Sequence, residues 1–172
     1  EYMEAVWWGF QQAHERGLVE RGKRSINQCP RCETAIAKNE VEYHQVEDPS
    51  IYVKFPLAER EGSLVAWTTT PWTVPANTFI AVDEDVTYAA VEATRDGETE
   101  LLYVAEGVVE EVLKKGRYES YEVRETLSGA EMLGWTYDHP LAEEVPDHPD
   151  FEGAGQVYHA DYVEVDRTGL VH

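Results

Sequence analysis

The sequence is short of basic residues. Its 172 residues contain 14 Lys and Arg against 34 Asp and Glu, which gives a formal net charge of −20 at pH 7. Nucleic-acid binding relies on basic side chains that neutralise phosphates, so this balance by itself argues against a phosphate-binding surface. The acidic residues are spread along the whole chain, and lysine is confined to Lys23, Lys38, Lys54, Lys114 and Lys115. The pattern is typical of a halophile protein, because molar salt shortens the screening length to about 3 Å.

Long hydrophobic runs and a disulfide framework are also missing. No apolar run approaches the length of a membrane span, and no signal peptide opens the chain. Cys29 and Cys32 are too close in sequence for an ordinary framework, which fits a reducing compartment. We therefore expect a cytoplasmic protein with no membrane partner. The chain starts without methionine at Glu1 and stops in mid-pattern at His172, so both ends are expected to continue in a longer protein.

Hydrophobic periodicity predicts a mainly β protein that also contains α-helix (α+β). An amphipathic helix is expected over residues 2–16, ended by Gly17, and a second helix over 107–115. A hairpin is expected across Arg95–Glu98. The strand-like segments are 41–46, 50–55, 64–69, 78–82, 87–92, 100–104, 121–124, 156–160 and 162–165. With a loop-rich piece over 128–141 and an acidic insertion over 143–152, they suggest a closed or partly closed β-barrel.

The segment from Trp67 to Asn77 concentrates polar chemistry in one place. It contains four threonines, two indoles, two prolines and an asparagine. Pro71 and Pro75 remove backbone donors, so a strand must break there. The result is a rigid loop lined with donors and acceptors, as in many small-molecule pockets. A threonine-rich strand end with a proline turn is the other interpretation, and composition alone favours it, because threonine is a good strand residue.

Cys29-Pro30-Arg31-Cys32 has the spacing of a metal knuckle. Two thiolates at this spacing can bind one edge of a tetrahedral zinc or iron ion. A structural zinc site needs four ligands, and His44, the nearest other candidate, lies in an expected strand. A redox pair is the alternative, but the strand-to-helix setting that lowers a thiol pKa is missing. We therefore expect half a site, completed by ligands outside the fragment, or no metal.

Taken together, the motifs resemble the isoleucyl-tRNA synthetase family, at its inserted editing (connective-peptide) domain. Residues 67–77 resemble the threonine-rich editing motif, and Thr168–His172 resemble the start of a second editing motif. Residues 29–32 with 39–43 resemble the zinc knuckle at the base of the insertion, and 128–141 a further piece of it. The resemblance implies a β-barrel editing domain of the valyl, isoleucyl and leucyl type, preceded by a helix from the catalytic core. It implies that core over 1–27, the knuckle and entry strands over 28–46, and an editing domain, truncated at its C-terminal side, over 47–172.

The resemblance also implies a function. The parent enzyme would join isoleucine to tRNA using ATP and Mg, as a monomer, and this portion would hydrolyse mischarged Val-tRNA(Ile) by water attack on the ester. Its partners would be the acceptor end of tRNA(Ile) and the valine or isoleucine ester. The implied catalytic residues, which bind the aminoacyl-adenosine end and position water, are Thr68, Thr69, Thr70 and His172. The implied substrate-binding residues are Trp67, Thr73 (a size filter), Asn77, Thr168 and Gly169, and the implied zinc ligands are Cys29 and Cys32.

The sequence departs from the family pattern in three ways. The family's aspartate for the substrate ammonium and its second cysteine pair would lie beyond His172, and the ATP-binding motifs of the HIGH and KMSKS kind do not occur. The fragment is therefore expected neither to activate isoleucine nor to bind ATP, and to deacylate Val-tRNA weakly or not at all by itself. Two alternatives stay open: a zinc-ribbon-like binding module, and a non-catalytic acidic β-barrel.

Overall fold

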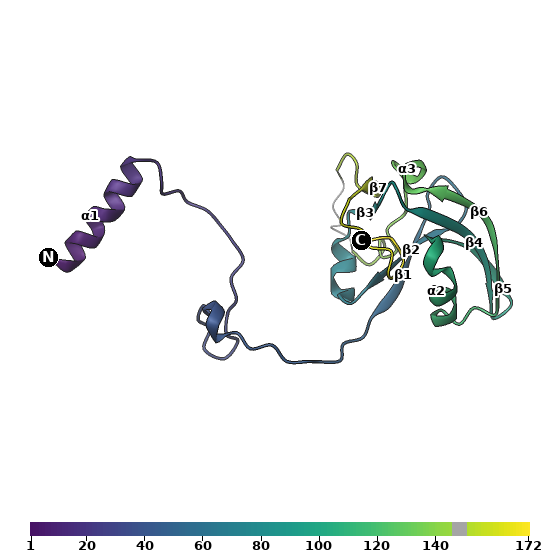
Figure 1. Ribbon diagram of the computed structural model, residues 1–172, viewed down its shortest axis with the longest axis horizontal. Coiled ribbons are helices and arrows are strands. Elements are labelled where there is room, and N and C mark those ends of the chain that lie inside the picture. The colour runs from purple at the N-terminus through teal and green to yellow at the C-terminus, as the bar shows by residue number, and fades with distance from the viewer. Residues whose placement is uncertain (146–150) are drawn as a thin grey trace. The chain divides into compact units, whose positions relative to one another are not determined.

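The structure is a computed structural model that describes residues 1–145 and 151–172 (Figure 1). The chain divides into two compact units, Glu1–Val46 and Glu47–His172. The acidic insertion expected over 143–152 lies partly outside the described residues. No helix in the described parts of the chain is long and apolar enough to cross a membrane.

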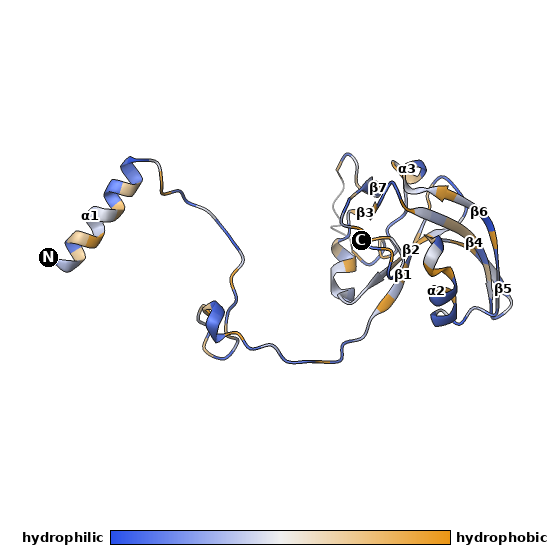
Figure 2. Ribbon diagram, viewed as in Figure 1, coloured by the Kyte–Doolittle hydropathy of each residue, from blue (hydrophilic) through white to orange (hydrophobic). Residues whose placement is uncertain are grey.

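The first unit begins with helix α1 (Tyr2–Glu15). Gly17 follows the helix with a φ of +69°, and the N–H groups of Gly17 and Leu18 donate to the carbonyls of His14 and Ala13. This is a Schellman cap, so the predicted helix and its terminating glycine are confirmed. Figure 2 shows hydrophobic and hydrophilic residues side by side on α1, and none of its residues is buried within this unit.

The strand predicted over 41–46 is wrong. After the short 3₁₀ turn η1 (Lys38–Glu40), the chain runs to residue 50 without regular structure. Tyr43 and Val46 are 93% and 76% exposed. An alternating sequence becomes a strand only where a neighbour takes up its backbone hydrogen bonds, and no described strand lies beside this segment.

The second unit is built on a five-stranded sheet in the order β1-β2-β5-β4-β6. Its strands are β1 (Ile51–Pro56), β2 (Ser63–Thr68), β4 (Thr87–Arg95), β5 (Glu98–Ala105) and β6 (Ser120–Ser128). Only β2 and β5 pair in parallel, while the other neighbours are antiparallel. Asp96 and Gly97 both have positive φ between β4 and β5, which is the geometry of a tight hairpin turn. The hairpin predicted here is confirmed.

Each face of this sheet is covered by apolar packing. The turn η3 (Glu106–Val108) leads into α2 (Val109–Lys115), which lies on one face in Figure 1. Val112 and Leu113 of α2 pack there with Val91 and Val104. The opposite face carries a second core cluster that includes Phe55, Leu64, Ile80, Tyr88, Met132, Tyr137 and Leu170.

A two-stranded parallel sheet closes part of the second core. It consists of β3 (Phe79–Val82) and β7 (Gln156–His159). Single bridges connect it to the rest of the unit, from Gln156 to Thr136 and from Ala81 to Val171, and a further bridge joins Leu57 to Tyr137. The predicted class, mainly β with α (α+β), is therefore confirmed. The loop-rich piece also contains a short helix, α3 (Gly129–Met132).

The strand predicted over 162–165 is also wrong. This stretch forms turns, in which Val163 is buried while Tyr162 and Val165 are 64% and 45% exposed. The turns return the chain to the five-stranded sheet, because the N–H of Ala105 donates to the carbonyl of Thr168 (2.8 Å). They thereby bring the last five residues against the end of β5.

Candidate functional site

The threonine segment forms a chain of hydroxyl groups at the end of β2. Thr68 is buried, and its Oγ1 accepts a hydrogen bond from the N–H of Thr70 (3.0 Å). The Thr70 Oγ1 lies 3.2 Å from the hydroxyls of both Thr68 and Thr73. The Thr73 hydroxyl donates to the Thr70 carbonyl (2.7 Å). Thr69 is exposed beside this chain, so the run presents hydroxyls in more than one direction.

The proline-containing half of the segment is helical rather than irregular. Residues Pro71–Ala76 form the 3₁₀ helix η2, with Pro71 in its first turn, where a missing N–H costs nothing. The carbonyl of Val74, within this turn, accepts from the N–H of Asn77 and lies 2.9 Å from Nε2 of His139. The expected rigid loop is thus fixed by regular hydrogen bonds.

Asn77 is buried where η2 meets β3. Its Nδ2 donates to the carbonyl of Phe79 (2.9 Å), and its Oδ1 accepts from the hydroxyl of Tyr137 (2.5 Å). Burial raises the pKa of Tyr137 well above its usual range, against a smaller lowering effect of the hydrogen bond to Asn77. Tyr137 therefore stays a neutral donor and holds the Asn77 amide in one orientation.

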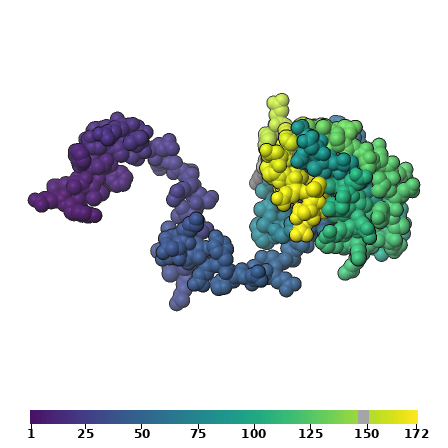
Figure 3. Space-filling view, viewed as in Figure 1, coloured from purple at the N-terminus to yellow at the C-terminus, as the bar shows by residue number. Residues whose placement is uncertain are grey.

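The second predicted motif lies against the same strand. Thr168 is fully buried, and its hydroxyl accepts from the N–H of Trp67 (3.3 Å) and donates to the carbonyl of Leu170 (3.2 Å). Gly169 has a φ of +72°, and a Cβ there would lie 2.6 Å from that of Ala105, so glycine is required. In the space-filling view (Figure 3), these C-terminal residues, in yellow, lie against teal residues of the preceding strands.

His172 reaches the hollow beside the threonine segment. Its ring stacks on Phe55 (centroids 6.3 Å apart), and Phe55 in turn meets Tyr137 edge to face (5.3 Å). Burial lowers the pKa of His172 below its usual 6.5, so the imidazole is neutral at pH 7. The hollow has a volume of about 240 Å³ and is lined by Thr73, Ala76, Asn77, Thr78, Phe79 and His172.

The predicted site residues are therefore divided between two surfaces. Thr73, Asn77 and His172 line one hollow, and hydrogen bonds connect Thr73 to Thr70 and Thr68. Trp67, Thr168 and Gly169 line another, where the Arg167 guanidinium lies 4.6 Å from the Trp67 ring centroid. Phe55, Phe79 and Tyr137 also lie at this site and were not predicted, although the apolar alternation of β1 and the aromatic residue inside a loop-rich piece were usable signals.

The arrangement suits the binding of a neutral or cationic ester better than that of a phosphate. Hydroxyl groups donate and accept, the asparagine amide is fixed, and the imidazole is an uncharged acceptor. No lysine or arginine is among the residues that line the hollow. Such groups can hold an ester carbonyl and orient a water molecule, but threonine hydroxyls without an adjacent base are poor nucleophiles.

The cysteine knuckle is a turn that directs two thiols to one side. The Cys29 N–H donates to the Thr34 carbonyl (3.0 Å), and the Cys32 N–H points at the Cys29 sulfur (3.4 Å). Hydrogen bonds from the backbones of Cys32 and Arg31 lower the pKa of Cys29, which favours the thiolate that a metal needs. Among residues 1–145 and 151–172, no three His, Cys, Asp or Glu side chains are grouped to hold an ion. The donors present thus fit half of a zinc site.

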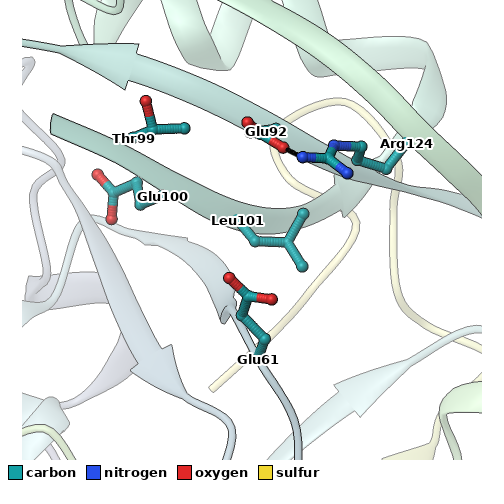
Figure 4. A pocket seen from close by; sticks show the side chains of 6 residues that line it. All are labelled: Glu61, Glu92, Thr99, Glu100, Leu101 and Arg124. Atoms are coloured by element: carbon teal, nitrogen blue, oxygen red, sulfur yellow. Dashed lines mark ion pairs between the residues drawn. The ribbon is translucent and has the colours of Figure 1, made fainter. Parts of the chain in front are cut away.

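A larger hollow lies elsewhere on the five-stranded sheet and shares no lining residue with the threonine hollow. It is lined by Glu61, Glu92, Thr99, Glu100, Leu101 and Arg124. Figure 4 shows the Arg124 guanidinium paired with the Glu92 carboxylate, while Glu61 stands opposite. Burial alone would raise the pKa of Glu100, but hydrogen bonds from Lys54 and Tyr118 outweigh burial and lower it. This hollow contains paired surface charges rather than a cluster of reactive groups.

Comparison with known proteins gives relatives over the whole chain. The family described as tRNA synthetases class I (I, L, M and V) matches residues 1–162. The isoleucine--tRNA ligases of Haloarcula marismortui, Natronomonas pharaonis and Methanoculleus marisnigri are 74%, 69% and 53% identical over 100% of the chain. The chain spans 16% of the length of each. Relatives from halophilic archaea fit the halophile-type charge predicted above.

Solved structures support the fold. The crystal structure of GlLeuRS-CP1 aligns with a TM-score of 0.55 at 19% identity, over 72% of this chain and 53% of that chain. The editing domain of the P. knowlesi cytosolic leucyl-tRNA synthetase aligns with a TM-score of 0.54 at 12% identity, over 71% of this chain and 56% of that chain. At these identities the likeness concerns the fold alone, and the fold is that of a synthetase editing domain.

Proposed function

The chain belongs to the class I tRNA synthetases of the I, L, M and V group, and on this premise we propose that it is the editing portion of an isoleucine--tRNA ligase. The parent protein joins isoleucine to tRNA(Ile) with ATP and Mg, in the cytoplasm and as a monomer. This portion hydrolyses Val-tRNA(Ile). The observation that carries the proposal is the hydroxyl chain Thr68–Thr70–Thr73, which ends in a hollow that Asn77 and His172 also line.

A second site is needed because a synthetic pocket cannot reject a smaller side chain well. One missing methylene is worth only about 1–3 kcal/mol, a limit for which isoleucyl enzymes are themselves the established example. A hydrolytic site then has to admit valine and exclude isoleucine by size. Thr73 stands at the wall of the hollow and is the proposed size filter.

The proposed reaction is water attack on the aminoacyl ester. The water oxygen bonds to the carbonyl carbon, the bond from that carbon to the ribose oxygen breaks, and the ribose oxygen takes up a proton. Thr69 and Thr70 orient the water and the ester, while Thr68 fixes Thr70 from the buried side. His172, neutral through burial, accepts a hydrogen bond from the substrate. Thr168 fixes the strand that carries the threonines, and it lines a second hollow together with Trp67 and Gly169.

The knuckle is proposed to bind zinc through Cys29 and Cys32, with the remaining ligands supplied by the parent chain. When bound, the ion would stabilise the turn and take no part in hydrolysis. A second candidate function is a zinc-ribbon-like binding module. It is favoured by the cysteine knuckle, in which hydrogen bonds lower the pKa of Cys29 and so favour the thiolate that binds zinc. A non-catalytic acidic β-barrel is the third possibility and predicts no tRNA ester hydrolysis under any condition.

The test is deacylation of Val-tRNA(Ile) and Ile-tRNA(Ile) in molar salt. Two proteins are compared: this chain alone, and the Haloarcula marismortui ligase with its matching segment replaced by this chain. We expect the chimera to hydrolyse the valyl ester much faster than the isoleucyl ester, and the chain alone to be weak. A chimera that aminoacylates but hydrolyses neither ester, or both equally, contradicts the proposal.

A further inference from the structure

A second hollow adjoins the threonine hollow, and the two share Phe79. Its lining residues are Phe79, Phe151, Gly153 and Tyr158. Three aromatic side chains therefore line one hollow beside the proposed hydrolytic site. No charged side chain is among these four, in a chain whose net charge is −20.

The pairing of β3 with β7 brings two of these rings together. Parallel register places Ala81 beside Tyr158 and Phe79 beside Gln156. The rings of Phe79 and Tyr158 meet edge to face, with centroids 5.7 Å apart. Phe79 is 46% and Tyr158 43% exposed, although the other three residues of β3 are buried. Both aromatic rings are thus partly exposed to solvent, at positions of β3 and β7 where a polar side chain would also be compatible with the strand.

Hydrogen bonds fix the Tyr158 ring and the backbone of Phe79. The Tyr158 hydroxyl donates to the Gly153 carbonyl (3.0 Å) and lies 3.4 Å from Oε1 of Gln156. Gly153 has a φ of +93°, and a Cβ there would come within 2.4 Å of the Tyr158 hydroxyl. On the other side, the Asn77 amide donates to the carbonyl of Phe79. A surface that is rigid before its ligand arrives loses little entropy on binding.

We propose that Phe79, Phe151 and Tyr158 form a stacking shelf for unpaired bases of the RNA end that carries the ester, an inference that rests on the proposed function. The occupant is argued from continuity: the ester lies in the threonine hollow, and Phe79 lines both that hollow and the aromatic one, so the nucleotides that precede the ester in a single-stranded tRNA end can pass directly onto the rings. Aromatic side chains stack unpaired bases whatever their sequence. Stacking also suits an acidic chain, because it needs no positive charge to hold the strand.

The experiment compares two substrates of the same hydrolytic site in the Haloarcula chimera described above. One is Val-tRNA(Ile), and the other is the valyl ester of adenosine, which has no preceding nucleotides. The variants are Tyr158→Leu and Phe151→Leu, which keep apolar bulk and remove the ring face. The matched control is Tyr121→Leu, since Tyr121 is 47% exposed on β6 and lines neither hollow.

We expect each shelf variant to lower kcat/KM for the tRNA ester about 5- to 150-fold, the equivalent of one base–aromatic stack, mainly through KM. Hydrolysis of the adenosine ester should stay unchanged in both variants, and the control should leave both substrates unchanged. If the shelf variants lower kcat/KM equally for both substrates, or for neither, the stacking shelf is contradicted while the proposed function stands. An unvaried chimera that hydrolyses neither substrate contradicts the proposed function, and the shelf falls with it.

Discussion

The buried hydroxyl of Thr168 accepts a hydrogen bond from the backbone N–H of Trp67, 101 residues earlier in the chain. This contact joins the threonine-rich motif of residues 67–77 to the second motif of residues 168–172. Since Trp67 lies directly before the threonine run, the position of that run depends on the C-terminal turn. The same hydroxyl donates to the Leu170 carbonyl, so the turn and the strand are fixed by one oxygen atom.

Replacement of Thr168 by valine should therefore destabilise the second unit. The shape is retained, but the Trp67 N–H and the Leu170 carbonyl lose their shared partner in a fully buried place. We expect a loss of about 1–3 kcal/mol in the free energy of unfolding, measured with urea in molar salt. Thr168→Ser keeps the hydroxyl and should lose less. Equal free energies of unfolding for the valine variant and the parent would show that the Thr168 hydroxyl does not stabilise the fold.

Tyr137→Phe should remove the hydrogen bond that orients the Asn77 amide. Both groups are buried, so the free energy of unfolding should fall by about 0.5–1.5 kcal/mol. Tyr121→Phe, at an exposed position of β6, is the control and should cost nothing measurable. In the chimera, Tyr137→Phe should also slow Val-tRNA hydrolysis, whereas an unchanged rate with lowered stability would make Tyr137 purely structural.

His172 should titrate below its usual pKa of 6.5, because burial disfavours the imidazolium. In the unfolded chain the imidazole binds a proton more readily than in the folded one. The stability that neutral His172 contributes is therefore present above pH 6.5 and is lost as pH falls through the lower folded pKa. NMR titration of the imidazole, with the resonance assigned from His172→Asn, measures this pKa. A value at or above 6.5 would contradict the buried placement.

The chain alone should bind zinc weakly. The described residues supply two thiolates and no third donor close by, while a structural site needs four ligands. We expect clearly less than one tightly held zinc per chain in a competition assay with a chromogenic chelator, and less still in Cys29→Ser. One full equivalent would instead favour the zinc-ribbon-like module.

Local signals in the sequence predicted the parts of the fold that depend on few residues. Gly17 ends α1 as a cap, and Asp96-Gly97 turns the β4–β5 hairpin, because both need a backbone that only certain residues adopt readily. Alternation of apolar and polar residues predicted strands over 41–46 and 162–165, and neither segment is a strand. Whether an alternating segment becomes a strand depends on a neighbouring strand, and sequence periodicity says nothing about that neighbour.

The site was only partly predictable for a similar reason. The motif residues Thr73, Asn77 and His172 do line one hollow. Phe55 lies in an alternating apolar strand and Tyr137 in a loop-rich piece, patterns that indicate packing residues, but only the tertiary structure shows that they contact His172 and Asn77. The net charge of −20 argues against a nucleic-acid partner, whereas the relatives are tRNA ligases. In a halophile-type protein the surface charge is an adaptation to high salt, so it is a poor guide to the ligand.

The central claim is that the threonine hydroxyls carry ester hydrolysis, and Thr70 lies in the middle of their chain. The most direct measurement is the rate of Val-tRNA(Ile) hydrolysis by the chimera with Thr70→Val, beside Thr126→Val on the exposed face of β6 as the matched control. We predict a fall of about 10²-fold or more for Thr70→Val, with aminoacylation by the parent retained and the control unchanged. An unchanged hydrolysis rate in the Thr70 variant would contradict the account.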